Sequence, residues 1–274
     1  MVSPTRRLII NADDLGADSS RNRGIFEAAR RGVVTDASLL VNFPGFDDAV
    51  ADPRIREFPV GLHLNISEGR PVGGGYRTLT GADGQFHGKE ETWRRALAGV
   101  LDPAEIHEEA SAQLGRMRAA GIEPSHVDGH QHLHLVPRVA AGLVALPVAR
   151  RVRLVFEHPD GTVVAGPEKA PFLNRLRELS AASRPLWAAA GWIWPAAHLG
   201  AGLIGAVHAG SLLRLLDLVP HGTTELLVHP GYPDTSSIPF SSGEREIELE
   251  ALLDPRLRDG LVSRGIALTS WLQL

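Results

Sequence analysis

The chain has 274 residues, of which 43% are hydrophobic and 22% are charged, and its formal net charge is −4. This length suits one α/β barrel or two small domains. The negative charge and the lack of any Lys/Arg block argue against a nucleic-acid partner. Because cysteine is absent, disulfide frameworks, thiol nucleophiles and Cys-type zinc sites are excluded. The chain runs into its first strand without an apolar signal segment, so we expect a cytoplasmic protein.

Strand and helix patterns alternate along the chain. The predicted strands are 7–12, 35–42, 59–65, 125–135, 151–156, 224–230 and 265–272. The first predicted helix is capped by Ser19 or Ser20 and ends at Gly32, and two more lie between 88 and 121. Further helices are predicted at 46–51, 137–146 and 244–253, and a basic amphipathic segment at 174–179. Because strands alternate with helices, the sheet should be mostly parallel, and about seven repeats suit a closed or nearly closed barrel.

The stretch 125–135, SHVDGHQHLHL, is rich in titratable side chains. Read as one extended strand, it places five of them on the same face. These are His126, Asp128, His130, His132 and His134. Burying these groups without partners would be costly, and a divalent cation is their natural partner because imidazole and carboxylate are common ligands. A His-rich edge exposed to solvent is the alternative interpretation.

Other candidate site residues follow other predicted strands. Asp13 and Asp14 come directly after the first strand, and His229 closes the strand at 224–230. Alternation places His63 and Asn65 on one face of the strand at 59–65. A lone His in an apolar strand is more often a core residue, but the carboxyl ends of parallel barrel strands meet at one rim, where active sites lie. The coincidence of these features favours a functional site.

The residue types at this rim favour metal-assisted hydrolysis of an ester or amide. Two imidazoles and one carboxylate leave coordination positions open for water and substrate. A second carboxylate can act as general base, and a further His can protonate the leaving group. No GxSxG elbow, Walker loop or GxGxxG motif occurs, which argues against serine hydrolases, NTPases and dinucleotide-binding enzymes.

Two long stretches are less regular. Residues 68–87 are rich in Gly, Pro and Thr and predict a surface loop, either a lid or a substrate rim. Residues 157–223 predict a less regular helical insertion within a single domain spanning 1–274. Inside it, 185–213 carries no formal charge, but Pro195 and frequent Gly argue against a transmembrane segment. We expect a buried helix pair, an apolar wall or a dimer face there.

Several motifs resemble one known family. They are NADDLG, Ser19–Ile25 (S-x-x-x-x-G-I), GVVTDASLLVN, GLHLN, HVDGHQHLH and VHPGYPD, in this order between Leu8 and Asp234. They resemble the YdjC-like carbohydrate deacetylases, a family that includes chitooligosaccharide deacetylase and the hopanoid-associated deacetylases. The resemblance implies a distorted (β/α) barrel, often dimeric, that removes an acetyl group from an N-acetylated sugar with one divalent metal ion. Residues 160–223 match little.

The same resemblance implies a role for individual residues. The implied metal ligands are Asp14, His63 and His130, the general base is Asp13 and the general acid is His229. The remaining candidates, beside the ligands or against the substrate, are Asp128, His132, His134 and Asn65. Zinc suits such ligands best by softness, and magnesium, manganese and cobalt stay possible, so we name Mg²⁺ or Zn²⁺ without choosing.

Two alternative functions stay open. A metal-dependent phosphoesterase or amidohydrolase would need phosphate-binding basic groups or a carboxylated lysine. The only lysines are Lys89 and Lys169, and neither ends a predicted strand. A non-catalytic sugar-binding barrel would lack a ligand or the Asp13/His229 pair, and the chain has all of them. The uncharged residues 185–213 also suggest the hypothesis that the sugar is lipid-linked.

Overall fold

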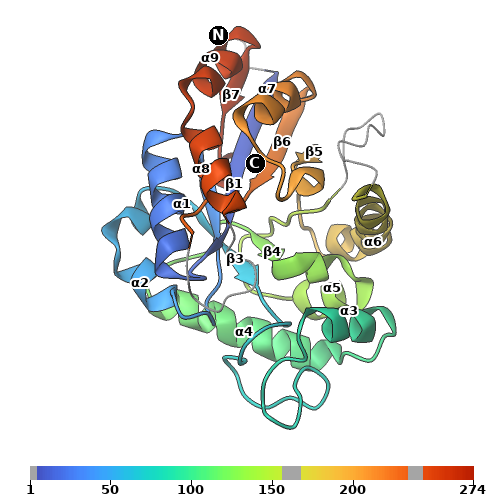
Figure 1. Ribbon diagram of the computed structural model, residues 1–274. Coiled ribbons are helices and arrows are strands. Elements are labelled where there is room, and N and C mark those ends of the chain that lie inside the picture. Colours follow the sequence, from blue (N-terminus) through green and yellow to red (C-terminus); the bar gives the residue numbers. More distant parts are fainter. Residues whose placement is uncertain (1–4, 156–167, 234–242) are drawn as a thin grey trace.

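The structure, a computed structural model, describes residues 5–155, 168–233 and 243–274. These residues form one sheet of seven strands in which every strand pair is parallel (Figure 1). The order is β4-β3-β2-β1-β6-β5, and β7 pairs with β1. The strands are β1 (Arg6–Leu15), β2 (Asp36–Leu39), β3 (Val60–Leu64), β4 (Val127–Gly129), β5 (Ala197–Leu199), β6 (Gly222–Val228) and β7 (Ile266–Leu268).

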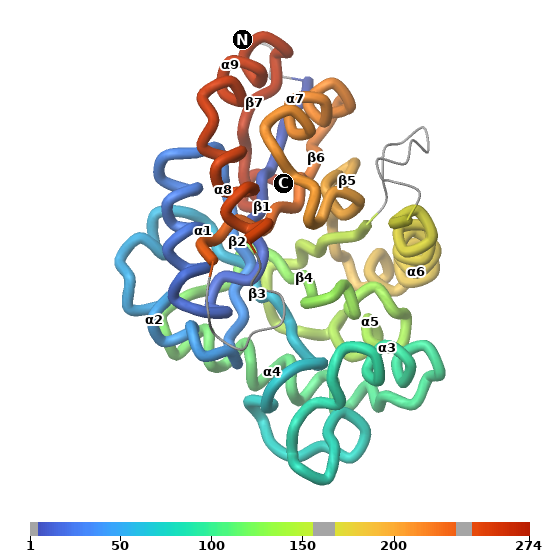
Figure 2. Tube along the Cα trace, viewed as in Figure 1, coloured from blue at the N-terminus to red at the C-terminus, as the bar shows by residue number. Residues whose placement is uncertain are grey.

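Helices surround the strands, as the tube in Figure 2 shows most clearly. In the described ranges the α-helices are α1 (Ser19–Arg31), α2 (Phe46–Ala51), α3 (Lys89–Leu97), α4 (Pro103–Ala119), α5 (Pro137–Leu143), α6 (Ala170–Ala189), α7 (Ala209–Asp217), α8 (Glu244–Leu253) and α9 (Pro255–Ser263). Short 3-10 helices are η1 (Pro53–Arg56), η2 (His130–Leu135), η3 (Ala201–Leu203) and η4 (Trp271–Gln273). None of these helices combines the length and apolar character that a membrane crossing requires.

The predicted α/β class with about seven mostly parallel strands is confirmed. The sheet curves into a distorted barrel, since β4 and β5 end the strand order without pairing with each other. Between them, among the residues that the structure describes, lie two isolated parallel bridges, Val127↔Val152 and Arg151↔Ile193. The strand predicted at 151–156 is therefore reduced to these bridges, and Phe156 lies outside the described residues. Every other predicted strand overlaps an observed one.

The structure corrects two local predictions. Asp18, rather than Ser19 or Ser20, caps α1, because its side chain accepts the Arg21 N–H at 2.7 Å. Residues 185–213 are not a helix pair: they form the end of α6, β5, η3 and the start of α7. A three-residue buried strand between Pro195 and Gly200 leaves too short a pattern to recognise in an uncharged sequence.

The prediction of one strand over 125–135 is wrong. β4 ends at Gly129, and η2 follows with left-handed backbone at Gln131 (φ 55°) and His132 (φ 60°). The chain folds back over Gly129, where a side-chain Cβ would lie 2.8 Å from His134 Nδ1. Since strand alternation stops at this turn, the common face predicted for five residues holds only for His126 and Asp128.

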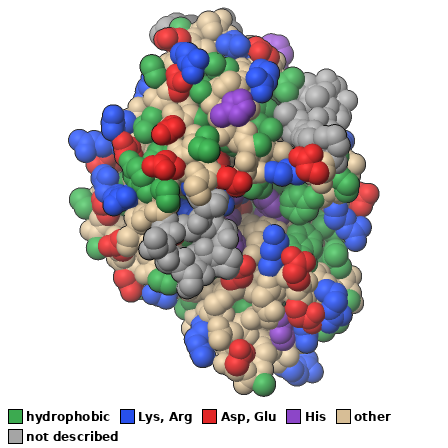
Figure 3. Space-filling model, in the orientation of Figure 1, with side chains coloured by type: hydrophobic (Ala, Val, Ile, Leu, Met, Phe, Trp, Pro, Cys, Tyr) green, Lys and Arg blue, Asp and Glu red, His purple; other side chains and the backbone are tan. Residues whose placement is uncertain are grey.

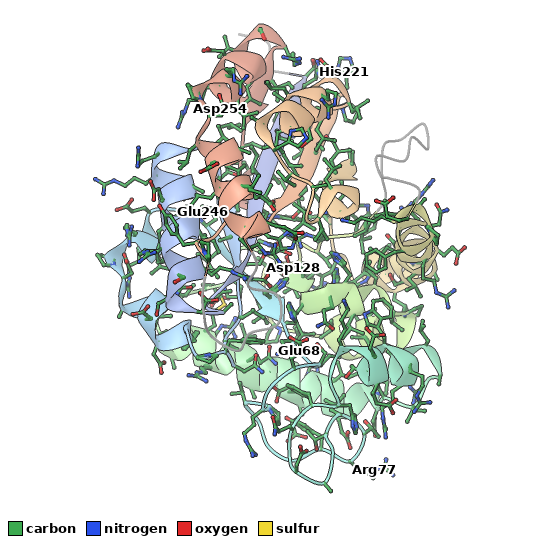
Figure 4. The ribbon with its side chains drawn as sticks, in the orientation of Figure 1. Glu68, Arg77, Asp128, His221, Glu246 and Asp254 are labelled. Carbon is green, nitrogen blue, oxygen red and sulfur yellow. The ribbon has the colours of Figure 1, made fainter. Side chains whose placement is uncertain are left out.

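The two faces of the sheet differ in polarity. On β1, Leu8, Ile10 and Ala12 belong to the apolar core shared with the helices, whereas Asn11 and Asp13 lie on the other face. That inner face carries buried polar side chains joined by hydrogen bonds, including Asn11, Asp13, Ser38, His63, Asp128, Arg153 and Glu225. Asp128 lies at the centre of the molecule in Figure 4, while Arg77, His221 and Asp254 lie at its edges. A polar barrel interior thus underlies the site.

Candidate functional site

A cavity of about 470 Å³ opens at the carboxyl ends of the strands. Figure 3 shows a hollow near the middle of this face with histidine side chains inside it. The lining residues are Asp13, Asp14, His63, Glu68, Lys89, Trp93, His130, Gln131, His132, Glu168, Lys169, Phe172, Ala201, Ile204, His229 and Arg245. The cavity thus brings together six of the nine predicted site residues. Asp128, His134 and Asn65 do not line it.

Three of the predicted residues converge on a single point of this cavity. Asp14 Oδ1 lies 3.2 Å from His130 Nδ1 and 3.5 Å from His63 Nε2. One ligand atom from each residue lies within 4.8 Å of the other two. Asp14 reaches this point with a left-handed backbone (φ 69°), where the register of β1 against β2 shifts. Because of this left-handed backbone, the side chains of Asp13 and Asp14 point in different directions.

A carboxylate fixes each of the two imidazoles from behind. His63 and Asp128 are register partners on β3 and β4, and His63 Nδ1 donates to Asp128 Oδ1 at 2.7 Å. His130 Nε2 donates to Glu68 Oε2 at 3.3 Å, and Glu68 Oε1 accepts Gln131 Nε2 at 2.8 Å. Because a carboxylate accepts from one ring nitrogen, the other ring nitrogen faces Asp14, and it is the nitrogen that can give up its proton to a cation.

Asp14 is held as an anion. Its second oxygen, Oδ2, accepts Arg21 Nη1 at 2.9 Å, and Arg21 is fully buried in α1. Burial opposes the charge of Asp14, but hydrogen bonds from His130 and His63 outweigh it and hold the pKa of this carboxyl well below its usual value. Oδ1 therefore stays negative and faces the imidazoles.

Asp13 belongs to a different cluster, centred on Arg153. Both oxygens of Asp13 accept from this guanidinium, at 2.6 and 2.8 Å. The same guanidinium lies 2.9 Å from Asp128 Oδ2 and 2.8 Å from Glu225 Oε1. All four side chains are buried, so three carboxylates share the guanidinium of Arg153. Such a cluster favours retention of a proton.

The pKa shifts of the three carboxyl groups are consistent with this shared guanidinium. Burial raises the pKa of Asp13, and Arg153 only partly offsets this. Burial also raises the pKa of Glu225 to about 8. Asp128, between Arg153 and His63, has its pKa held well below the usual value because these cations outweigh its burial. Asp13 and Glu225 are therefore the groups that take up protons.

His229 follows β6 and faces the same cavity. β1 and β6 pair with Ala12 opposite Val228, so Asp13 and His229 leave the sheet side by side. The His229 N–H donates to Glu248 Oε1 at 2.7 Å, which fixes the backbone at this point. Burial and the positive charge of Arg245 hold the pKa of His229 well below its usual value, so the ring is neutral.

The remaining predicted residues either hydrogen-bond to the segments around the site or line the cavity. His134 is buried and donates from Nε2 to the Arg153 carbonyl at 2.8 Å, so it supports the Arg153 segment. Asn65 is buried, and its Oδ1 accepts the backbone N–H groups of Ser67 and Glu68, which sets the turn that leads to Glu68. His132 lines the cavity, with its ring 6.3 Å from that of Phe172.

Sequence reasoning missed the charged residues that hold the site together. Arg153 and Glu225 were visible as charged residues inside apolar strand patterns, which is a usable signal of a buried polar partner. Arg21 and Glu68 lie in a helix and a loop and carry no such signal. Lys89 begins α3 and Lys169 precedes α6, yet both line the cavity without lying at the end of a strand.

The converging residues fit a divalent cation. Asp14, His63 and His130 offer one carboxylate oxygen and two imidazole nitrogens, all from buried side chains. Burial favours neutral His63, but Asp128 and Asp13 outweigh it and raise its pKa to about 10. A cation bound here would replace that proton, as metal binding to imidazole requires. Asp13, His63 and Asp128 form a second possible group, but Asp128 already binds His63 Nδ1.

Comparison with known proteins identifies the family. The family model described as YdjC-like protein matches residues 7–262. The chain belongs to the YdjC-like protein family. The resemblance predicted from the sequence motifs is thereby confirmed, although Asp234 of the last motif lies outside the described residues.

Curated relatives from this family cover nearly the full chain. A carbohydrate deacetylase from Mus musculus is 37% identical over 98% of this chain and 94% of its own length. A carbohydrate deacetylase from Brevibacillus brevis is 31% identical over 98% of this chain and 99% of its own length. A chitooligosaccharide deacetylase from Serratia marcescens is 31% identical over 97% of this chain and 98% of its own length.

A solved structure supports the same fold. It is a protein from Enterococcus faecalis named as a candidate cellobiose-phosphate cleavage protein. It superposes with a TM-score of 0.73 at 24% identity, over 98% of each chain. At this identity the likeness concerns the fold alone.

Proposed function

We propose that this protein is a metal-dependent carbohydrate deacetylase, which hydrolyses the acetamide of an N-acetylated sugar to a free sugar amine and acetate. The observation that carries the proposal is the convergence of Asp14, His63 and His130 within 4.8 Å, beside the buried base candidate Asp13. The names of the curated relatives, carbohydrate deacetylase and chitooligosaccharide deacetylase, favour the same reaction here.

Asp14, His63 and His130 would hold the metal ion, which we take to be Mg²⁺ or Zn²⁺. The chemistry that a divalent cation supplies to such a site is a more acidic water and a polarised carbonyl oxygen. Asp128 and Glu68 keep the two imidazoles in the required orientation. Arg21 keeps Asp14 Oδ2 occupied, so that Oδ1 is the oxygen left for the ion.

Asp13 is the general base in this proposal. Its Oδ2 lies 3.9 Å from His63 Nε2, so it borders the ligand atoms without being one of the three. Arg153 and Asn11 hold its oxygens in place, with Asn11 Nδ2 at 2.8 Å. Since burial raises the pKa of Asp13, the carboxylate is a better proton acceptor than an exposed aspartate.

His229 is the group that protonates the departing amine. The ring begins neutral, because burial and Arg245 keep its pKa low, and it must gain a proton during the reaction. Asp13, which lines the same cavity, takes a proton from the attacking water, and a proton then has to pass from Asp13 to His229 before the amide nitrogen is protonated. The amide C–N bond then breaks with the proton on nitrogen, which gives the amine and acetate.

The cavity wall fits a sugar. Trp93 and Phe172 provide aromatic surface, and Ala201 and Ile204 from the uncharged stretch provide an apolar wall. Aromatic faces are common surfaces for sugar rings because C–H groups pack against them. The apolar wall keeps the hypothesis of a lipid-linked sugar open to test.

A metal-dependent phosphoesterase is the second candidate. Lys89 and Lys169 both line the cavity, and these are the only lysines of the chain. Basic side chains of this kind are what a phosphate substrate would need. An assay with a chromogenic phosphomonoester separates this candidate from the deacetylase.

The test is acetate release from N-acetylglucosamine, its β-1,4-linked oligomers and a lipid-linked analogue, with p-nitrophenyl phosphate as the phosphoesterase arm. Each assay is run after chelation and again after Mg²⁺ or Zn²⁺ is added back. We expect acetate release that is lost on chelation and restored by metal. Phosphate release alone, or no acetate release by folded, metal-loaded protein, would contradict the proposal. Equal turnover of soluble and lipid-linked sugars would remove the reason to invoke a lipid.

A further inference from the structure

A second cavity, of about 430 Å³, lies on the surface away from the candidate active site. Its walls come from α1, η1 and the segment after β6. We call it the arginine pocket, and its lining residues are Arg23, Glu27, Arg30, Arg31, Arg54 and Tyr232. None of them lines the active-site cavity. Figure 3 shows Lys and Arg side chains grouped on the left of the view, over α1.

Positive charge in the arginine pocket is only half compensated. Arg31 pairs with Glu27, and Arg54 pairs with Asp52. Arg23 instead stacks over the Tyr232 ring, 4.7 Å from its centroid. Among the described residues, neither Arg23 nor Arg30 has a carboxylate within ion-pair distance. Four guanidinium groups thus line the pocket beside one carboxylate, Glu27, in a chain whose net charge is −4.

Part of the pocket is also rigid. The Tyr232 hydroxyl donates to Glu27, and the Tyr232 N–H donates to the Ser20 carbonyl at 3.3 Å. Gly24 lies directly against Gly231, since a Cβ on Gly24 would sit 2.6 Å from Gly231 Cα. These contacts fix the segment after β6 against α1. The Tyr232 ring, over which Arg23 stacks, is therefore held in place without a ligand.

We propose that the arginine pocket binds a phosphate monoester. Guanidinium groups bind phosphate oxygens in pairs through their planar fork, and a phosphate monoester carries close to two negative charges at neutral pH. That charge matches the two uncompensated arginines, Arg23 and Arg30. A volume of about 430 Å³ suits a small phosphorylated molecule rather than an isolated ion.

The position of the pocket gives binding a structural consequence. Arg21, which donates to Asp14 in the active-site cavity, belongs to the same helix α1. Tyr232 belongs to the segment after β6, which begins with His229. A ligand held by Arg23 and Arg30 would lie on α1, next to the segment that follows His229. The phosphate could belong to a soluble metabolite or to a lipid headgroup, since both present the same dianion. The proposal does not depend on the deacetylase assignment.

Calorimetric titration of the full chain tests the proposal without any sugar substrate. The probes are inorganic phosphate, glucose 6-phosphate, and phosphatidylcholine vesicles with or without phosphatidate. The variants are Arg30→Gln and the double variant Arg23→Gln/Arg30→Gln. Arg214→Gln is the matched control, because Arg214 is also an exposed arginine in the last turn of a helix.

We expect at least one phosphate monoester, soluble or in vesicles, to bind the wild-type protein. Removing each arginine should weaken binding about tenfold, the loss typical for a hydrogen bond to a charged group, and Arg214→Gln should leave it unchanged. Binding of glucose 6-phosphate alone identifies a soluble ligand, and binding of phosphatidate vesicles alone identifies a headgroup. No binding by the wild-type protein, or equal binding by the double variant, overturns the proposal.

Discussion

Asp13 and Asp14 are neighbours on β1, but the groups around them differ. Asp14 faces two imidazole nitrogens, and its other oxygen lies 2.9 Å from Arg21 and 3.9 Å from Arg245. Asp13 shares Arg153 with Asp128 and Glu225, so three carboxylates contact one guanidinium. The pKa of Asp14 is accordingly held low by its hydrogen bonds against burial, whereas burial raises the pKa of Asp13.

The difference assigns two kinds of chemistry to one strand end. A carboxylate that stays charged beside two imidazole nitrogens suits a metal ligand. A carboxylate with a raised pKa in a crowded acidic cluster suits a proton acceptor. The left-handed backbone of Asp14 makes these separate roles possible. It takes the Asp14 side chain out of the strand alternation that Asp13 follows. Five substitutions test the division.

Asp14→Asn should have the largest effect. It removes an anionic oxygen of the proposed ligand set, and Arg21 then faces a neutral amide in place of the Asp14 carboxylate. Changes behind metal ligands already cost 10–100-fold in metal affinity, so loss of a ligand should exceed about 100-fold. Calorimetric titration with Zn²⁺ measures this. Asp47→Asn, at a highly exposed carboxylate, is the control. If Asp14→Asn bound Zn²⁺ about as tightly as this control, Asp14 would not be a metal ligand.

Asp13→Asn should separate turnover from metal binding. Asparagine keeps the shape but cannot accept the proton, so turnover should fall by about 10²–10⁴-fold. Metal affinity should stay close to that of the wild-type protein, because Asp13 is not among the three converging ligands. Acetate release and metal titration on the same preparation provide both values. Wild-type turnover in Asp13→Asn would remove the role assigned to this carboxylate.

His229→Ala should give a similar separation. Loss of the imidazole removes the proposed proton donor and leaves the three proposed ligands in place. We expect a loss in turnover on the order of 10²-fold or more with metal retained. The same two measurements apply. A variant that turns over normally would show that the amine leaves without help from His229.

The residues brought together by strand register were the ones that sequence reasoning could find. His63, His229 and the acidic pair sit at strand ends, and the carboxyl ends of parallel strands share one rim. The charged residues behind them were not found, since Arg21 and Glu68 reach the site from a helix and a loop. Their positions depend on tertiary packing, such as the turn set by Asn65.

Backbone irregularity accounts for the errors in the fold. Alternation was extended through His134, but the chain turns back at Gly129 with two left-handed residues, Gln131 and His132. No residue of the stretch signals that turn except Gly129 itself. The short strand β5 was missed because three residues are fewer than any periodic pattern needs.

Glu68→Gln should have a smaller effect than any ligand change. The neutral amide still contacts His130 but holds its ring nitrogen less strongly than a carboxylate. Metal affinity should fall about 10-fold, at the lower end for a group behind a ligand. Glu57→Gln, at an exposed glutamate, is the matched control. Equal affinities in the two variants would show that Glu68 does not support the Asp14 cluster.

Glu225→Gln should have the smallest effect, and it appears only as a dependence on pH. Burial raises the pKa of Glu225 from 4.5 to about 8, so between these values the folded chain keeps a proton that the unfolded chain has lost. This contribution to stability is fully present below pH 4.5 and is lost as pH rises through about 8. Glutamine keeps the contact with Arg153 and has no proton to lose.

The melting temperature of Glu225→Gln, relative to the wild-type protein, should therefore rise between pH 5 and pH 8, by an amount on the order of several degrees. Thermal unfolding at four or five pH values, with Glu250→Gln as the exposed control, measures this. Parallel curves for wild type and variant would mean that Glu225 is already charged at pH 5. Arg153 would then hold three full negative charges, and the Asp13 cluster would have no proton to distinguish it from the Asp14 cluster.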